Sequence, residues 1–119
     1  MEVLIVDDNE LNVRALQRVL GRRHAVRVAT TAKAALEAVR QRRPDVILCD
    51  FELGDHTCTE FLREVTREWP GVRRVLYSAS QPEQWTELVS DHLIDAALAK
   101  PVTTEVLMAA LDGLSPSLH

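Results

Sequence analysis

The N-terminal stretch Val3-Leu4-Ile5-Val6-Asp7-Asp8 consists of four apolar residues followed by two acids, and its pattern recurs along the chain. Asp50 follows the apolar run 46–49, Ser78 follows the segment 72–77, and Lys100 follows the run 96–99. If these segments are parallel and adjacent strands, the polar residues that follow them collect at one edge of a sheet. Ligand sites in open α/β sheets form at that edge, beyond the carboxyl ends of the strands.

Segments with helical periodicity alternate with the strand-like runs. We expect strands near residues 3–6, 25–29, 45–49, 72–77 and 95–99, and helices near residues 10–21, 31–41, 58–68 and 103–112. A further helix is expected after Ser80-Gln81-Pro82-Glu83, which has the sequence of a capping box. Thr30 or Thr31 supplies the N-cap of the second helix.

Two helices have apolar stripes that we expect to face the sheet. The stripes consist of Leu11, Ala15, Leu16, Val19 and Leu20 in the first helix, and of Trp85, Leu88, Val89 and His92 in the fourth. Continuous apolar strands joined by helices predict a parallel sheet covered on both faces. With right-handed crossovers, the prediction is an α/β fold, a five-stranded parallel sheet in a three-layer (βα)5 sandwich.

The composition is that of a globular protein, with 46% apolar and 27% charged residues in a chain of 119. We expect one domain over residues 1–119, with a core of 2–113 and a frayed tail of 114–119. No apolar run approaches the roughly 20 residues of a membrane helix. The N-terminal Met-Glu lacks a signal-peptide pattern, so we expect a cytoplasmic protein without a membrane partner.

The net charge and the two cysteines bear on which ligands and which cysteine chemistry we expect. The net charge of −4 argues against direct binding of nucleic acid. Cys49 and Cys58 have neither metal-ligand spacing nor a CxxC pattern, and we expect both to be reduced thiols.

The three acids would repel one another strongly at the sheet edge unless a cation neutralised them. Carboxylate ligands with room for water suit Mg²⁺, which also binds phosphoryl oxygens. Lys100 is a flexible point charge that can meet a phosphate or a carboxylate, and the Ser78 hydroxyl can donate to a phosphate oxygen. An aspartate beside Mg²⁺ and lysine can also act as a nucleophile that forms an aspartyl phosphate.

With these residues in this order, the chain resembles the CheY-like receiver domains of two-component response regulators over residues 2–113. The resemblance is carried by Val6-Asp7-Asp8-Asn9, by Asp50 after the third strand, by Ser78-Ala79 after the fourth and by Lys100-Pro101 after the fifth. Each motif alone is weak, whereas the four in this order are specific. The resemblance implies a flavodoxin-like, doubly wound sheet with strand order 2-1-3-4-5.

The resemblance also implies how the site is used. Asp50 would be the phosphoacceptor, charged by a partner histidine kinase or histidine phosphotransfer protein. Asp8, Asp50 and the main-chain carbonyl of Glu52 would bind Mg²⁺, and Asp7 would act largely through a metal-bound water.

A second group of residues would recognise the phosphoryl group. Lys100 would pair with Asp50 before phosphorylation and with the phosphoryl group afterwards. Ser78, followed by Ala79, would move toward a phosphoryl oxygen and report its presence. Pro101 would follow a cis peptide bond.

The chain departs from the family's usual pattern in four places. The aromatic residue that usually stands three positions before the lysine is replaced by Ala97. The loop Leu53-Gly54-Asp55-His56-Thr57-Cys58 lacks the usual proline and Asp-Gly pair. Glu52 and Ser80 flank the path of an attacking water, and we expect them to tune dephosphorylation.

The leading interpretation is a signalling switch with only self-phosphorylation and autodephosphorylation chemistry, not a turnover enzyme. It would act by switching protein contacts. Formation of a homodimer through residues 81–112 is left as an open alternative. One alternative is a degenerate receiver that serves as a phosphorylation-independent protein-binding platform, which Ala97 favours. A second is a Mg²⁺-dependent phosphohydrolase with an aspartate nucleophile, although such enzymes usually have a cap domain and an Asp-x-Asp motif after the first strand. A flavin-binding version of the fold would need a phosphate loop that the sequence lacks.

Overall fold

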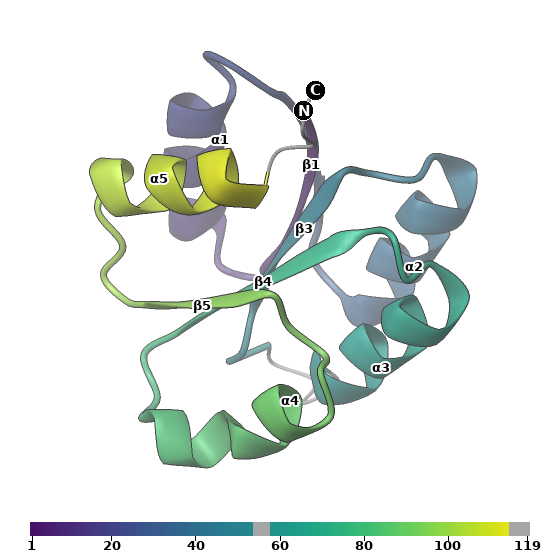
Figure 1. The fold of residues 1–119 in the computed structure, drawn as a ribbon. Coiled ribbons are helices and arrows are strands. Elements are labelled where there is room, and N and C mark those ends of the chain that lie inside the picture. The colour runs from purple at the N-terminus through teal and green to yellow at the C-terminus, as the bar shows by residue number, and fades with distance from the viewer. Residues whose placement is uncertain (54–57, 115–119) are drawn as a thin grey trace.

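The computed structural model describes residues 1–53 and 58–114. Its strands form a single parallel sheet in the order β2-β1-β3-β4-β5, which confirms the predicted doubly wound α/β fold. The strands are β1 (Glu2–Val6), β2 (Ala25–Ala29), β3 (Val46–Asp50), β4 (Arg73–Ser78) and β5 (Ala96–Ala99). Figure 1 shows this sheet between the helices.

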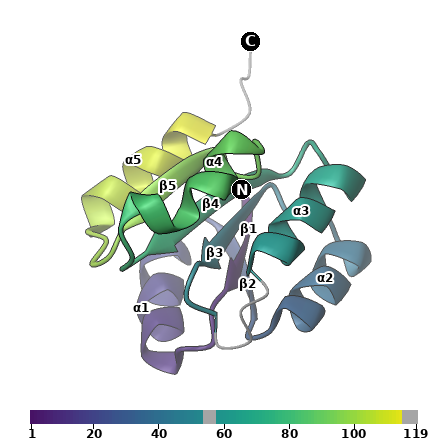
Figure 2. The same cartoon turned by 90° about the horizontal axis from the view of Figure 1, so that it is seen from below.

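Helices cover both faces of the sheet, as Figure 2 shows. Helices α1 (Glu10–Leu20) and α5 (Thr104–Leu114) lie on one face, and α2 (Ala32–Gln41) and α3 (Cys58–Glu68) lie on the other. The short 3-10 helix η1 (Pro82–Trp85) and α4 (Thr86–Ser90) follow β4. None of the helices described in residues 1–53 and 58–114 is long and apolar enough to cross a membrane.

Two apolar cores, one on each face, hold the layers together. One core joins alternate residues of the strands to α2 and α3 and includes the fully buried Phe61 and Leu62. The other joins the opposite strand residues to α1 and α5 and includes Leu20 and Leu111. Each fully buried side chain of this size contributes about 1.5–3 kcal/mol to stability. The central strand β3 is buried at every position, as expected for a strand covered on both faces.

The strand register places the carboxyl ends of the central strands together. Asp50 pairs with Tyr77, and Ser78 pairs with Ala99, so the polar residues that end β3 and β4 lie near the start of the segment after β5. Main-chain hydrogen bonds continue the ladder past the strand ends, from Phe51 N to the carbonyl of Tyr77 (3.0 Å) and from Lys100 N to that of Ser78 (2.9 Å). These bonds fix the backbone on which the site is built.

A buried arginine fastens β4 to the segment that leads into β5. The Arg74 side chain, only 7% exposed, donates to the carbonyls of Leu93 (3.0 Å) and Val72 (2.7 Å). The main-chain N–H of Arg74 donates to the Asp95 carboxylate at 2.7 Å, and the Asp95 N–H donates back to the Arg74 carbonyl at 2.7 Å. Buried charge is tolerated here because its donors are satisfied.

Two local predictions near α4 are wrong. The capping box does not pair Ser80 with Glu83. Instead the Gln84 side chain accepts from the Gln81 N–H at 3.1 Å, the Gln84 N–H donates to the Gln81 carbonyl at 2.9 Å, and Pro82 occupies the first turn. The side chain of Ser80 is engaged elsewhere, by Glu52. Because α4 is little more than one turn long, it buries only Leu88, and Val89 of the predicted stripe is 53% exposed.

The end of α4 explains why His92 is not part of an inward stripe. His92 has φ 57°, the left-handed conformation that ends helices, and it is exposed. Its N–H donates to the Val89 carbonyl (3.1 Å), and the Leu93 N–H donates to the Leu88 carbonyl (2.8 Å). This is the Schellman pattern, and the buried pair Leu88 and Leu93 supplies its apolar contact.

The remaining helix ends are close to the predictions, but the predicted stripe of α1 is wrong at two positions. Thr31, not Thr30, caps α2 by accepting from the Ala34 N–H at 3.0 Å. In α1, Leu20 is buried, but Leu11 is 77% exposed and Ala15 is also exposed, because Val13 takes the inward position. Helix α5 extends to Leu114, one residue beyond the predicted core, and residues 115–119 of the predicted tail lie outside the described residues.

Candidate functional site

Three carboxylates gather at the carboxyl edge of the sheet. Asp7 follows β1 and is buried, Asp8 is exposed, and Asp50 ends β3 with 2% of its surface exposed. One oxygen from each lies within 4.8 Å of the others. The sequence prediction that these acids would meet is therefore confirmed.

The chemistry of this cluster fits a hard divalent cation. Asp7 is held in place because its Oδ1 accepts from the Asn9 N–H at 2.9 Å and its Oδ2 accepts from the Tyr77 hydroxyl. Asp50 Oδ1 accepts from the Glu52 N–H at 3.0 Å. Oxygen-only ligands of this kind, with the exposed Asp8 on the water side, are those that Mg²⁺ prefers.

Lys100 is the cation that balances part of this charge. Its Nζ lies 2.8 Å from Asp50 Oδ1 and 3.4 Å from Glu52 Oε1, and it stands 5.0 Å above the centre of the Tyr77 ring. Burial alone would lower the pKa of Lys100, but the hydrogen bond to Asp50 and the negative charges of Asp50 and Glu52 together outweigh it and raise that pKa. Burial raises the pKa of Asp50, and the bond from Lys100 opposes the rise. The peptide bond from Lys100 to Pro101 is cis, as the resemblance implies.

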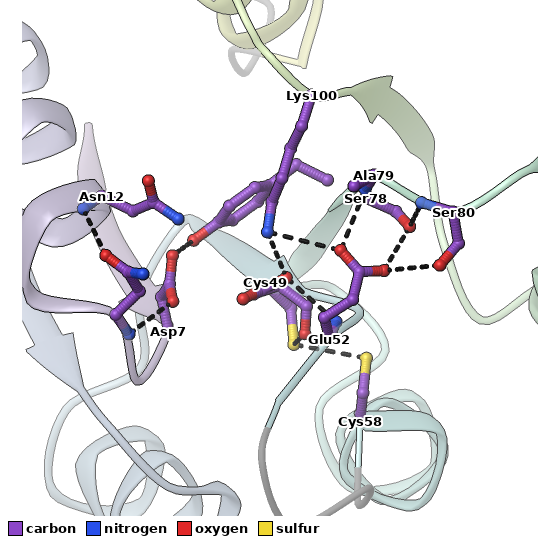
Figure 3. A network of polar contacts seen from close by, with 12 residues as sticks. Asp7, Asn12, Cys49, Glu52, Cys58, Ser78, Ala79, Ser80 and Lys100 are labelled. Atoms are coloured by element: carbon purple, nitrogen blue, oxygen red, sulfur yellow. Dashed lines mark hydrogen bonds and ion pairs between the residues drawn. The ribbon is translucent and has the colours of Figure 1, made fainter.

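The Glu52 carboxylate lies on the opposite side of Lys100 from Asp7, as Figure 3 shows. Its Oε2 accepts from the Ser78 hydroxyl (2.5 Å) and the Ser80 hydroxyl (3.0 Å). Its Oε1 accepts from the Ala79 N–H at 2.9 Å. Partial burial would raise the pKa of Glu52, but these hydrogen bonds, first that from Ser78, and the charge of Lys100 outweigh it and lower the pKa. Glu52 is therefore an anion bound by the residues predicted to recognise a phosphoryl group.

Tyr77 belongs to the site, although its place in the sequence does not predict this role. It is 3% exposed, and its hydroxyl donates to Asp7 while its ring lies beneath Lys100. Burial and the bond to Asp7 raise its pKa, so the hydroxyl stays protonated and remains a donor. The available signal was its position directly before Ser78, at a strand end. Ala97, where family members usually carry a ring, is exposed on β5.

A groove of about 450 Å³ opens beside these residues. It is lined by Asn12, Ala15, Leu16, Tyr77, Ala79, Lys100, Pro101 and Val102. The groove therefore gives solvent access to Lys100 and Tyr77 from the side of α1 and of the segment that leads into α5.

The two cysteines lie beneath Asp50. Cys49 and Cys58 are buried and free, as predicted, with their sulfur atoms 3.5 Å apart. The hydrogen bond with Cys58, together with burial, raises the pKa of Cys49 well above its ordinary value, which makes this thiol unreactive. The predicted unusual loop includes residues 54–57, which lie outside the described residues.

Comparison with known proteins assigns the family. The sequence model of the family named response regulator receiver domain matches residues 3–112. The chain therefore belongs to the response regulator receiver domain family, whose members bind Mg²⁺ at an acidic pocket and are phosphorylated on aspartate by histidine kinases. The acidic cluster and Lys100 occupy the place where such chemistry is expected in this fold.

The curated relatives include both regulators and kinases. The chain is 30% identical to the transcriptional regulatory protein ZraR of Escherichia coli O157:H7, over 100% of this chain and 27% of that protein. It is 32% identical to the sensor histidine kinase AruS of Pseudomonas aeruginosa, over 99% of this chain and 12% of that protein. It is 41% identical to the aerobic respiration control sensor protein ArcB of E. coli K12, over 59% of this chain and 9% of that protein. The chain thus spans only a small part of the length of these relatives.

Solved structures support the fold. The chemotaxis response regulator CheY4 of Vibrio cholerae superposes with a TM-score of 0.86 at 24% identity, covering 96% of this chain and 98% of that one. A signal receiver domain from Pseudomonas fluorescens Pf-5 superposes with a TM-score of 0.89 at 23% identity, covering 95% of this chain and 85% of that one.

Proposed function

We propose that the protein is a phosphoacceptor in a two-component phosphorelay, with Asp50 as the residue that receives the phosphoryl group. The observation that carries the proposal is the position of Asp50: its Oδ1 lies 2.8 Å from Lys100 Nζ, and one of its carboxylate oxygens lies within 4.8 Å of oxygens of Asp7 and Asp8. The donor would be a phosphohistidine of a histidine kinase or histidine phosphotransfer protein, in keeping with family membership.

The transfer needs little covalent work from the protein. A carboxylate oxygen of Asp50 attacks phosphorus, the P–N bond to the donor imidazole breaks, and the freed imidazole takes a proton from water. Asp8, Asp50 and the Glu52 carbonyl would hold Mg²⁺, with Asp7 acting through a bound water. When bound, Mg²⁺ neutralises charge on the phosphoryl oxygens. Lys100 orients the Asp50 carboxylate and supplies a fixed positive charge.

The switch would lie at the end of β4 and in the residue that follows it. Ser78 and the Ala79 N–H are donors that a phosphoryl group on Asp50 could bind, together with Lys100, and their movement would report phosphorylation. The protein would be a signalling switch, not a turnover enzyme. It would act in the cytoplasm through protein contacts, without binding nucleic acid directly. A homodimer through residues 81–112 is one form these contacts could take.

Glu52 and Ser80 would set how long the signal lasts. Dephosphorylation requires water to attack phosphorus, which releases inorganic phosphate and restores the Asp50 carboxylate. Glu52 adds a negative charge beside that path and holds the Ser80 hydroxyl at 3.0 Å. Autodephosphorylation rates should therefore differ between the wild type and Glu52→Gln, and equal rates would show that Glu52 has no such role.

Incubation with acetyl phosphate and Mg²⁺, followed by mass spectrometry of the intact protein, tests the function. One phosphoryl group should be gained by the wild type and none by Asp50→Asn. Labelling that persists in Asp50→Asn would refute the assignment. A wild type that is never labelled would favour the alternative, a receiver used as a phosphorylation-independent binding platform, which the absence of a ring at Ala97 supports.

A further inference from the structure

The Glu52 carboxylate is fully bound in the absence of any phosphoryl group. Each of its oxygens has two positive or hydrogen-bonding partners: Ser78 and Ser80 for Oε2, and Ala79 and Lys100 for Oε1. Figure 3 shows Glu52 between Lys100 and the Ser78–Ser80 segment. The carboxylate therefore occupies a small anion site built from the end of β4, the segment after it and the residue that follows β5.

This anion site uses the donors that a phosphoryl group on Asp50 would need. A phosphoryl group has three strong acceptor oxygens and a charge between −1 and −2 at neutral pH. Ser78 has a single hydroxyl proton, which it donates to Glu52, and Ala79 has a single N–H, which it also donates to Glu52. Neither donor can serve two acceptors fully, and the two anions would repel each other.

We propose that the Glu52 carboxylate is an internal competitor that occupies the phosphoryl-oxygen site of the resting protein. It must leave before Ser78 and Ala79 can bind the phosphoryl group. The proposal rests on the phosphoacceptor function proposed above. Departure is feasible because the Glu52 side chain is 34% exposed and can rotate into water without any change in the core.

The competition has a measurable size. When a site is available for only a fraction of the time, the apparent dissociation constant rises by the inverse of that fraction. Charge-assisted hydrogen bonds are strong enough to keep the site filled roughly nine-tenths of the time. Removing the competitor should then tighten binding of a phosphoryl analogue by about tenfold.

Beryllofluoride, formed from a beryllium salt and excess fluoride and added with Mg²⁺, is a suitable probe because it can occupy the place of a phosphoryl group on Asp50. Its binding is followed by the amide signals of ¹⁵N-labelled protein. We expect Glu52→Ala to bind it about tenfold more tightly than the wild type, and the Ala79 amide signal to shift in this variant even before the probe is added. Glu37→Gln, which removes one charge from the exposed surface of α2, should match the wild type.

Glu52→Asp separates occupation of the site from simple charge repulsion. It keeps the negative charge but is shorter by one methylene, about 1.5 Å, and cannot hold all four partners. Occupation predicts that Glu52→Asp binds the probe as tightly as Glu52→Ala. If Glu52→Asp behaves like the wild type while Glu52→Ala binds more tightly, repulsion alone explains the effect and the proposal is wrong.

The same titration distinguishes this proposal from the function on which it rests. Equal affinities in the wild type and Glu52→Ala, both binding in the micromolar to millimolar range, would overturn the competition and leave the phosphoacceptor function standing. Failure of every protein to bind beryllofluoride would overturn both. Weaker binding by Glu52→Ala would show that Glu52 assists the phosphoryl group and would also overturn the proposal.

Discussion

Replacing Asp50 with Asn should make the metal-free protein more stable, because this carboxylate lies in an unfavourable place. At an effective dielectric constant of about 20, the attraction to Lys100 at 2.8 Å is worth about 6 kcal/mol. Asp7 and Asp8, with oxygens within 4.8 Å, each repel Asp50 by about 3.5 kcal/mol on the same scale. The exposed Asp8 is partly screened by water, so attraction and repulsion nearly cancel.

Burial then decides whether Asp50→Asn raises or lowers the free energy of unfolding. Because Asp50 is 2% exposed, its charged form has lost most of its hydration, and its pKa is raised for that reason. Asn keeps the shape and removes the charge. We expect Asp50→Asn to gain about 1–2 kcal/mol of unfolding free energy. For a domain of this size that corresponds to a rise in melting temperature of roughly 3–10 °C.

Thermal unfolding followed by circular dichroism in EDTA at pH 7 measures the effect. Glu37→Gln again serves as the control, since it removes one negative charge far from the cluster and should change stability by less than about 0.5 kcal/mol. Added Mg²⁺ should stabilise the wild type and have little effect on Asp50→Asn. A melting temperature in EDTA that is lower for Asp50→Asn than for the wild type would refute the reasoning, because it would mean that the Lys100 pair outweighs repulsion and burial.

Two other substitutions test contacts that the structure reveals. Tyr77→Phe removes the hydroxyl that binds the buried Asp7 and should cost about 1.5–3 kcal/mol of unfolding free energy in EDTA, measured by urea denaturation; an unchanged midpoint would show that the bond contributes nothing. Arg74→Met keeps much of the apolar volume but leaves the carbonyls of Leu93 and Val72 without their donor. It should cost about 2–4 kcal/mol in the same assay, and a cost below about 0.5 kcal/mol would contradict the role assigned to this arginine.

The position of the site could be predicted from the sequence because topology alone determines it. Parallel strands end at one edge, so residues that directly follow apolar runs must meet there, and Asp7, Asp50, Ser78 and Lys100 do. Such a prediction depends only on the strand ends, which a run of apolar residues marks clearly.

Side-chain direction could not be predicted in the same way. In the sequence, Tyr77 is indistinguishable from the apolar residues of β4 that precede it. Only the three-dimensional pairing of β4 with β3 reveals that its hydroxyl reaches Asp7. The prediction of a capping box at Ser80 is wrong because a hydroxyl next to a helix start can bind either the helix N-terminus or a nearby anion. Here the anion is Glu52, which lies 28 residues away in the sequence. Long-range partners of this kind leave no local signal.

The Glu52 contact also bears on how a receiver without a ring at position 97 can transmit a signal. Ser80, held by Glu52, directly precedes Gln81, the N-cap residue of η1, whose N–H donates to the Gln84 side chain. Displacement of Glu52 would free the Ser78 and Ser80 hydroxyls in one step and release the backbone that leads into η1 and α4. Leu88 is the only buried residue of those two elements, and Trp85 packs partly buried against the core. The elements are short and otherwise exposed, so a change at Ser80 should meet little resistance there. If the competition proposed above holds, the carboxylate of Glu52 would be the part that moves, in place of the missing ring.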